Sequence, residues 1–306
     1  KAAELLERAA ELVAPAAAAE TVSTFAATVI SNIYAYLAGV YQHCGLFDDA
    51  DRWARRALEF GTAHNVLFAQ ALGYEFLGED ASHKGEHAAA LEYADREREI
   101  VEKLHSRERR SWAHLVAALS AKGVGDNERA DREFREGIKL AESVGELRVA
   151  SLLKGNFAVF QAEQAVRKGL TSTGTSSSPA TGRVAALDEA LQTAIDNLKA
   201  ADSFGLLYSQ FEGRRCLAVV RLLRGELDEA ERLCKEASEL VSNTESRLGQ
   251  LWLGPLYMDV LLAAGKRSEA AAKLKPYSQL VAGCQAPRFK REASRLAALL
   301  EGISAP

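Results

Sequence analysis

The stretch YAYLAGVYQHCGLFDDADRWARRAL, residues 34–58, decides the fold. Its large residues Tyr34, Leu37 and Tyr41 are spaced three and four positions apart, so they share one face of an α-helix. Gly45 then ends this helix, and a second apolar stripe with helical spacing follows it. We therefore predict two helices joined by a tight turn.

A glycine or alanine followed five residues later by alanine recurs along the whole chain. Successive pairs are 40 residues apart, except that 60 residues separate the third pair from the fourth. Such a period is typical of a solenoid, in which each helical hairpin contacts only its neighbours. We predict that residues 1–306 form a single all-α, right-handed superhelical solenoid of about six hairpins. The pairs are Gly45/Ala50, Gly85/Ala90, Gly125/Ala130, Ala185/Ala190, Gly225/Ala230 and Gly265/Ala270.

The order of large, small and turn residues in each unit resembles that of the tetratricopeptide repeat. The third and sixth units match this pattern more loosely than the others do. The period of 40 residues exceeds the usual ~34. In this respect the chain resembles the long-helix type of repeat found in maltose-activator-like transcription factors and beside signalling ATPases and cyclases of bacteria. The resemblance implies a shape and not a reaction. In the first unit the matching residues are Tyr34, Leu37, Ala38, Tyr41, Gly45, Ala50 and Ala57.

Residues 169–182, GLTSTGTSSSPATG, interrupt the fourth unit. They have neither apolar periodicity nor charge, which predicts a flexible loop between that unit's two helices. One interpretation is an insertion tolerated at a loop tip. The other is a lid or a modification site, with Ser178 as the hydroxyl.

Composition limits the class of protein and its partners. Apolar residues make up 48% of the chain, and the net charge of −4 gives no drive toward nucleic acid or an anionic membrane, so we expect neither as a partner. No apolar run reaches the ~18 residues of a membrane span. The four cysteines form no C-x-x-C pair and no secretory signal precedes them, which predicts a cytoplasmic protein with reduced thiols. Lys1 begins inside a predicted helix, and we expect a fragment of a longer protein.

No stretch predicts a catalytic centre, so we expect no enzyme activity, metal or cofactor. His83 and His87 match the letters H-x-x-E-H of a zinc site, but Gly85 is a predicted turn and breaks the helix that such a site requires. The segment from Gly169 resembles a phosphate-binding loop without its lysine.

The first helix of each unit should line the concave side of the solenoid, a surface suited to a peptide or a partner's helix. Related repeats that hold chaperone C-termini imply a clamp of Lys, Asn and Arg, whereas the matching positions here include Ala35, Gly39 and Glu75, which disfavours that partner. The candidate groove residues are Asn32, Gln42, Glu75, Glu79, Trp112, Leu115, Glu212, Arg215, Trp252 and Asp259.

Several candidate residues have a second interpretation. Trp112, Trp252, Tyr208 and Phe211 either anchor a partner or fill the interfaces between repeats, and the second role is more common. Arg215 with Glu212 is either a recognition site or a structural ion pair.

The sequence thus predicts a non-catalytic scaffold that binds a protein or peptide, as the sensory or regulatory module of a larger bacterial regulator. The alternative is a sensor domain that binds a small-molecule effector, which requires an enclosed polar pocket. Homo-oligomerisation through the ends or the convex side is a further hypothesis. The amphipathic helix expected at Pro287 to Leu300 either caps the last hairpin or begins another unit.

Overall fold

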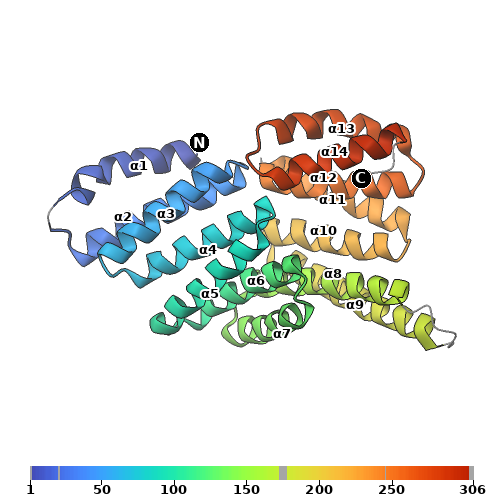
Figure 1. The fold of residues 1–306 in the computed structure, drawn as a ribbon, viewed down its shortest axis with the longest axis horizontal. Coiled ribbons are helices and arrows are strands. Elements are labelled where there is room, and N and C mark those ends of the chain that lie inside the picture. Colours follow the sequence, from blue (N-terminus) through green and yellow to red (C-terminus); the bar gives the residue numbers. More distant parts are fainter. Residues whose placement is uncertain (1, 20, 172–177, 245, 303–306) are drawn as a thin grey trace. The chain divides into compact units, whose positions relative to one another are not determined.

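The computed structural model describes residues 2–19, 21–171, 178–244 and 246–302, which contain 14 α-helices and no strand (Figure 1). The prediction of an all-α helical-repeat fold is confirmed. The helices are α1 (Ala2–Ala17), α2 (Thr24–His43), α3 (Phe47–Ala63), α4 (Leu67–Lys84), α5 (His87–Leu104), α6 (Arg107–Val124), α7 (Asn127–Val144), α8 (Leu147–Thr171), α9 (Ser178–Phe204), α10 (Leu207–Leu223), α11 (Leu227–Thr244), α12 (Arg247–Ala263), α13 (Arg267–Ala282) and α14 (Pro287–Glu301).

The helices from α2 to α13 form six consecutive hairpins, each with a first and a second helix. We predicted a single array, and the chain divides into two compact units. Unit 1 comprises Lys1–Val144 and Gly283–Phe289, and unit 2 comprises Gly145–Ala282 and Lys290–Pro306. In unit 1 the ring of Phe289 stacks on that of Phe47, with centroids 6.3 Å apart.

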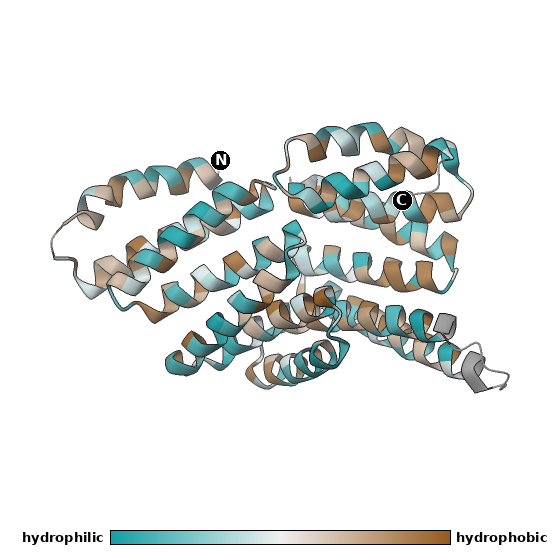
Figure 2. Cartoon of the chain, in the orientation of Figure 1, coloured by the Kyte–Doolittle hydropathy of each residue, from teal (hydrophilic) through white to brown (hydrophobic). Residues whose placement is uncertain are grey.

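Small residues allow the helices of neighbouring hairpins to approach closely. Ala50, Ala54 and Ala57 on α3 are fully buried. A Cβ at Gly73 of α4 would lie 3.0 Å from the carbonyl oxygen of Ala54, so only glycine fits there without a shift. Figure 2 shows hydrophilic and hydrophobic residues interspersed along the helices, as expected when each helix buries one face.

A residue with positive φ lies in the turns between hairpins as well as within them. The sequence predicted the glycine turns within hairpins but not the turns between them, where Asn65 (φ 54°) and His105 (φ 53°) adopt the same left-handed conformation without being glycine. The turn residues are therefore 20 positions apart in unit 1, at 45, 65, 85, 105 and 125.

The fourth hairpin differs from the prediction of a loop at 169–182. The backbone is helical up to Thr171 and again from Ser178, while residues 172–177 lie outside the part that the structure describes. The additional residues lengthen α8 to 25 and α9 to 27 residues, so Ala185 lies within α9 and not at the hairpin turn. Pro179 is compatible with this start because a proline in the first helical turn costs no hydrogen bond.

The predicted helix at the end of the chain is confirmed as α14. Within unit 2 its Arg295 pairs with Asp259 of α12 through two contacts of 3.0 and 2.8 Å. None of the described helices combines the length and the apolar character needed to cross a membrane.

Candidate functional site

Side chains from three first helices of unit 2 converge on Arg215. Its Nε and Nη2 donate to the Glu212 carboxylate, one helical turn away on α10, at 3.0 and 2.7 Å. Nη2 also reaches Oδ1 of Asn156 on α8 at 3.4 Å, and the guanidinium carbon lies 5.6 Å from the ring centroid of Trp252 on α12. We call Asn156, Glu212, Arg215 and Trp252 the Arg215 cluster.

The ion pair within this cluster fixes the guanidinium and neutralises it. Burial disfavours the charge of Arg215, but the Glu212 carboxylate outweighs this effect and raises the pKa of Arg215. The Arg215 and Glu212 side chains are only 14% and 9% exposed. The cluster therefore presents a held guanidinium over an indole ring and little net charge, which does not suit a terminal carboxylate.

Three of the predicted groove residues, Glu212, Arg215 and Trp252, thus come together in space. Asn156 was not among the groove residues predicted from the sequence. The Nδ2 of Asn156 donates to the Leu152 carbonyl at 2.9 Å, which leaves Oδ1 for Arg215. A single amide in an apolar stretch is the signal that would have found it. Asp259 is not part of the cluster and pairs with Arg295.

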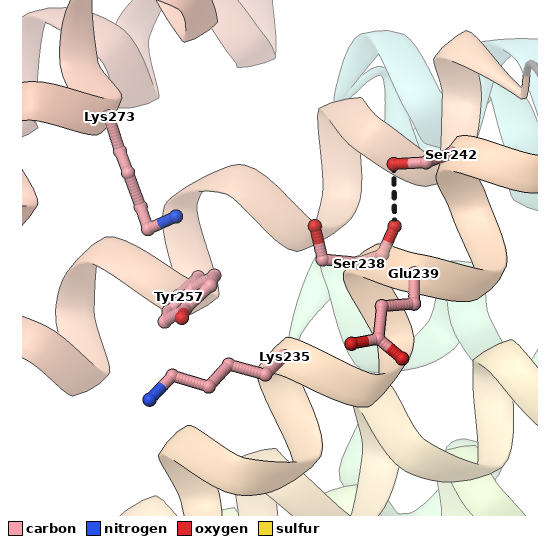
Figure 3. A pocket seen from close by; sticks show the side chains of 6 residues that line it. All are labelled: Lys235, Ser238, Glu239, Ser242, Tyr257 and Lys273. Atoms are coloured by element: carbon pink, nitrogen blue, oxygen red, sulfur yellow. Dashed lines mark hydrogen bonds between the residues drawn. The ribbon is translucent and has the colours of Figure 1, made fainter.

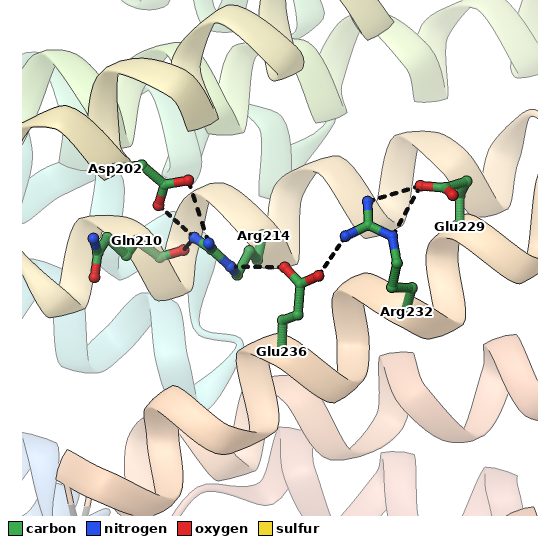
Figure 4. Close-up of polar contacts among 6 residues, drawn as sticks. All are labelled: Asp202, Gln210, Arg214, Glu229, Arg232 and Glu236. Atoms are coloured by element: carbon green, nitrogen blue, oxygen red, sulfur yellow. Dashed lines mark hydrogen bonds and ion pairs between the residues drawn. The ribbon is translucent and has the colours of Figure 1, made fainter.

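The adjacent Arg214 has a different role, because neighbouring residues of a helix point about 100° apart. It donates to Asp202 of α9 at 2.7 Å and to Glu236 of α11 at 3.1 Å, as Figure 4 shows. Arg232 continues this network by pairing with Glu236 and with Glu229. The network joins three consecutive helices of unit 2. It gives Arg214 a structural role that is separate from the Arg215 cluster.

In unit 1 the predicted groove positions hold buried polar pairs. Gln42 of α2 donates to Asp80 of α4 at 2.9 Å, and both side chains are buried. Glu75 of α4 pairs with Arg109 of α6, which also lies 3.9 Å from the fully buried Glu97 of α5. The Gln42–Asp80 and Glu75–Arg109 pairs each join the first helices of successive hairpins, which is a structural role.

The other predicted positions of unit 1 differ in their burial. Trp112 and Leu115 are buried, at 9% and 4% exposure. Asn32 and Glu79 are half-buried. Phe211 lies in unit 2 and is, like Tyr208, one of the four aromatic candidates. It is also buried.

Burial raises the pKa of two carboxyl groups in unit 1. It raises the pKa of Asp80 well above its usual range, against the opposing hydrogen bond from Gln42. It raises the pKa of Glu97 in the same way, and the nearby Glu79 carboxylate adds to the effect. Both groups therefore favour the neutral form in the folded chain.

The histidine motif considered for a metal site lies across a turn. Gly85 has φ 86° and ends α4, while His87 begins α5. Burial, with the charges of Arg288 and Lys122, lowers the pKa of His87. Within the described ranges, no group of three or more His, Cys, Asp or Glu side chains is placed to hold a metal ion.

Comparisons with known proteins give the fold. The sequence matches no protein-family model and no curated protein. Among solved structures it is similar to a Rap protein complexed with competence and sporulation factor, with a TM-score of 0.54 and 13% identity over 91% of this chain and 81% of that chain. It is also similar to aspartyl phosphate phosphatase F from Bacillus subtilis, with a TM-score of 0.58 and 14% identity over 90% of this chain and 70% of that one.

A third similar structure is a signal transduction ATPase with numerous domains from Pyrococcus horikoshii, which carries a tetratricopeptide repeat sensor. The TM-score is 0.53 and the identity 16%, over 98% of this chain and 41% of that one, so this chain spans less than half of that protein. At such identities the likeness shows the fold alone. This chain therefore shares a helical-repeat fold with these three structures, one of which carries a tetratricopeptide repeat sensor.

Proposed function

We propose that this chain is a non-catalytic scaffold that binds a peptide or a segment of another protein on the first-helix face of unit 2. The observation that carries this proposal is the Arg215 guanidinium held 5.6 Å over the Trp252 ring by Glu212 and Asn156. Trp and Arg are the residues that contribute most to binding energy at interfaces. Because the guanidinium is already fixed, little conformational entropy is lost when a partner binds.

The charge balance of the cluster indicates the chemistry of the partner. Glu212 already occupies the Arg215 fork, so a second carboxylate would have to displace it. An apolar or aromatic side chain against Trp252 and a backbone carbonyl near Arg215 fit without that cost. We expect an extended or helical segment with an apolar anchor and no acidic terminus at this point.

The similar structures support a regulatory role. One is a Rap protein in complex with competence and sporulation factor, and another carries its repeats as a sensor. We propose by analogy that this chain is the sensory module of a larger bacterial regulator in the cytoplasm. Aspartyl phosphate phosphatase F has an enzyme's name. The only carboxylate of the Arg215 cluster is paired, and the Cys216 thiol beside Arg215 is buried, so we propose no catalysis here.

Selection of a displayed peptide library on the purified chain, followed by calorimetry with the selected peptide, tests this proposal. We expect Trp252→Ala to weaken binding by about 30-fold, the effect of losing an anchor that contributes about 2 kcal/mol. Tyr36→Ala is the matched control, since Tyr36 is an aromatic residue of unit 1 with 54% exposure. Equal binding by the wild type and Trp252→Ala, with both folded by circular dichroism, would contradict the proposal.

A further inference from the structure

A pocket of about 510 Å³ lies on unit 2 between the second helices α11 and α13, with α12 at its base (Figure 3). It is separate from the Arg215 cluster, because Tyr257 in the pocket and Trp252 in the cluster are five residues apart on α12 and so point about 140° apart. The lining residues are Lys235, Ser238, Glu239, Ser242, Tyr257 and Lys273.

Among the described residues, two charged groups of opposite sign line this pocket without an ion-pair partner. The Lys273 ammonium lies 4.1 Å from the centroid of the Tyr257 ring, and no carboxylate in the described part of the chain is within ion-pair distance of it. Glu239 likewise has no cationic partner among the residues that the structure places. Lys235 differs, because its ammonium is bound to Glu231 at 2.6 Å.

The base and wall of the pocket supply further groups. Tyr257 is 7% exposed. Burial, assisted by the charges of Glu231, Cys234 and Glu269, raises the pKa of Tyr257 to about 12, so its phenol stays protonated. Ser242 donates its hydroxyl to the Ser238 carbonyl at 2.8 Å, which leaves the Ser238 hydroxyl to the pocket. Figure 3 shows Lys273 beside Tyr257 and Glu239 on the opposite wall.

We propose that this pocket binds a small zwitterion of the amino-acid type, with the ligand's carboxylate at Lys273 and its ammonium at Glu239. The reason is charge matching. A simple anion would face Glu239, and a simple cation would face Lys273 and Lys235, whereas a zwitterion satisfies both unpaired groups. The Ser238 hydroxyl adds a hydrogen bond to either end, and Tyr257 provides an apolar base.

This inference goes beyond the peptide-binding role and does not depend on it. The two sites use different faces of α12, so Trp252→Ala should leave binding in the pocket unchanged. Loss of peptide binding and loss of zwitterion binding are thus separable.

Calorimetry on the full chain with each standard L-amino acid in turn tests the proposal. For the amino acid that binds best, we expect the N-acetyl and the carboxamide derivatives each to bind at least about tenfold more weakly, because each lacks one charge. Lys273→Met and Glu239→Gln should each cause a similar loss. Lys275→Met is the matched control, since Lys275 is exposed on the same helix and does not line the pocket.

Three results would overturn the proposal. The first is that no amino acid binds to the wild type. The second is that a blocked derivative binds as well as the free amino acid. The third is that inorganic phosphate binds in a Lys273-dependent way and binds more tightly after Glu239→Gln, which would identify a simple anion site. Circular dichroism of each variant separates loss of binding from loss of folding.

Discussion

Trp112 and Trp252 occupy the same position of the repeat, one in unit 1 and the other in unit 2. Trp112 is 9% exposed on α6, a helix with buried residues on most of its faces. Trp252 is half-buried and lies under Arg215. The comparison teaches that the position in the repeat orients a side chain, while its neighbours decide whether it packs in the interior or remains accessible.

Glu75 and Arg215 repeat this contrast, because they also occupy equivalent positions. Glu75 is 5% exposed and pairs with Arg109 of the next first helix, so its charge is used to join repeats. Arg215 pairs within its own helix and projects over an aromatic ring. The same repeat geometry thus gives unit 1 a structural pair and unit 2 a candidate recognition site.

The largest effect is expected from truncating the two tryptophans. Trp112→Ala should lower the free energy of unfolding by about 3–5 kcal/mol, because it leaves a cavity in a packed region. Trp252→Ala should lower the free energy of unfolding by less than half as much, because the Trp252 ring is only half-buried. Its main effect should be on partner binding. Urea denaturation followed by circular dichroism measures both. Equal losses of stability would remove the distinction between the two positions.

The ion pairs give the second test. Arg109→Met leaves the Glu75 charge buried without a partner, which should lower the free energy of unfolding by about 3–5 kcal/mol. Arg215→Met leaves Glu212, which is buried to nearly the same extent as Glu75, without its partner, and we expect a loss of similar size, about 3–5 kcal/mol. Adding Glu75→Gln to Arg109→Met should restore part of the stability, because it removes the unpaired charge. Failure of this rescue would show that Arg109 acts through packing alone.

Much of the fold could be predicted from the sequence because glycine and alanine mark the closest approaches of the helices. The Gly45 and Gly85 turns follow from this pattern. The turns at Asn65 and His105 could not be predicted from this pattern, because these residues only tolerate the left-handed conformation that glycine favours. The long helices of the fourth hairpin were missed because a Ser/Thr-rich composition favours a loop, whereas the proline within it can start a helix.

Less of the candidate site could be predicted. Periodicity indicates which face of a helix a residue lies on, and this was enough to include both Arg215 and Trp252 among the groove candidates. It does not indicate which residue of a neighbouring helix will lie opposite, so Asn156 was missed. Nor does it show that Gln42 would face Asp80 in a buried pair, because that depends on how two first helices pack.

The third prediction concerns pH and unit 1. The pKa of Asp80 is raised in the folded state, so the neutral carboxyl group stabilises the folded chain. This stability is fully present below the unfolded pKa of about 3.9 and is lost as pH rises through the folded pKa. Asp80→Asn keeps an acceptor for Gln42 and cannot ionise. At about pH 8 it should raise the free energy of unfolding by about 1–3 kcal/mol.

Urea denaturation at several pH values measures this effect, with Glu136→Gln on the exposed face of α7 as the control. The control should keep the wild-type pH dependence. A variant Asp80→Asn that is less stable than the wild type at every pH would show that the ionised carboxylate is the form that the folded chain requires.

The smallest effects are expected at His105 and Gly205, which occupy the same turn position in unit 1 and unit 2 and have φ of 53° and 67°. Gly205→Ala should cost about 1 kcal/mol, because an added Cβ meets no neighbouring atom but strains a left-handed residue. His105→Gly relieves the strain of a left-handed residue but gives the unfolded chain more conformational freedom. The two effects nearly cancel, so the free energy of unfolding should change by less than about 0.5 kcal/mol. Urea denaturation of both variants tests this asymmetry. A gain above about 1 kcal/mol for His105→Gly would mean that the histidine is more strained than its backbone angle indicates.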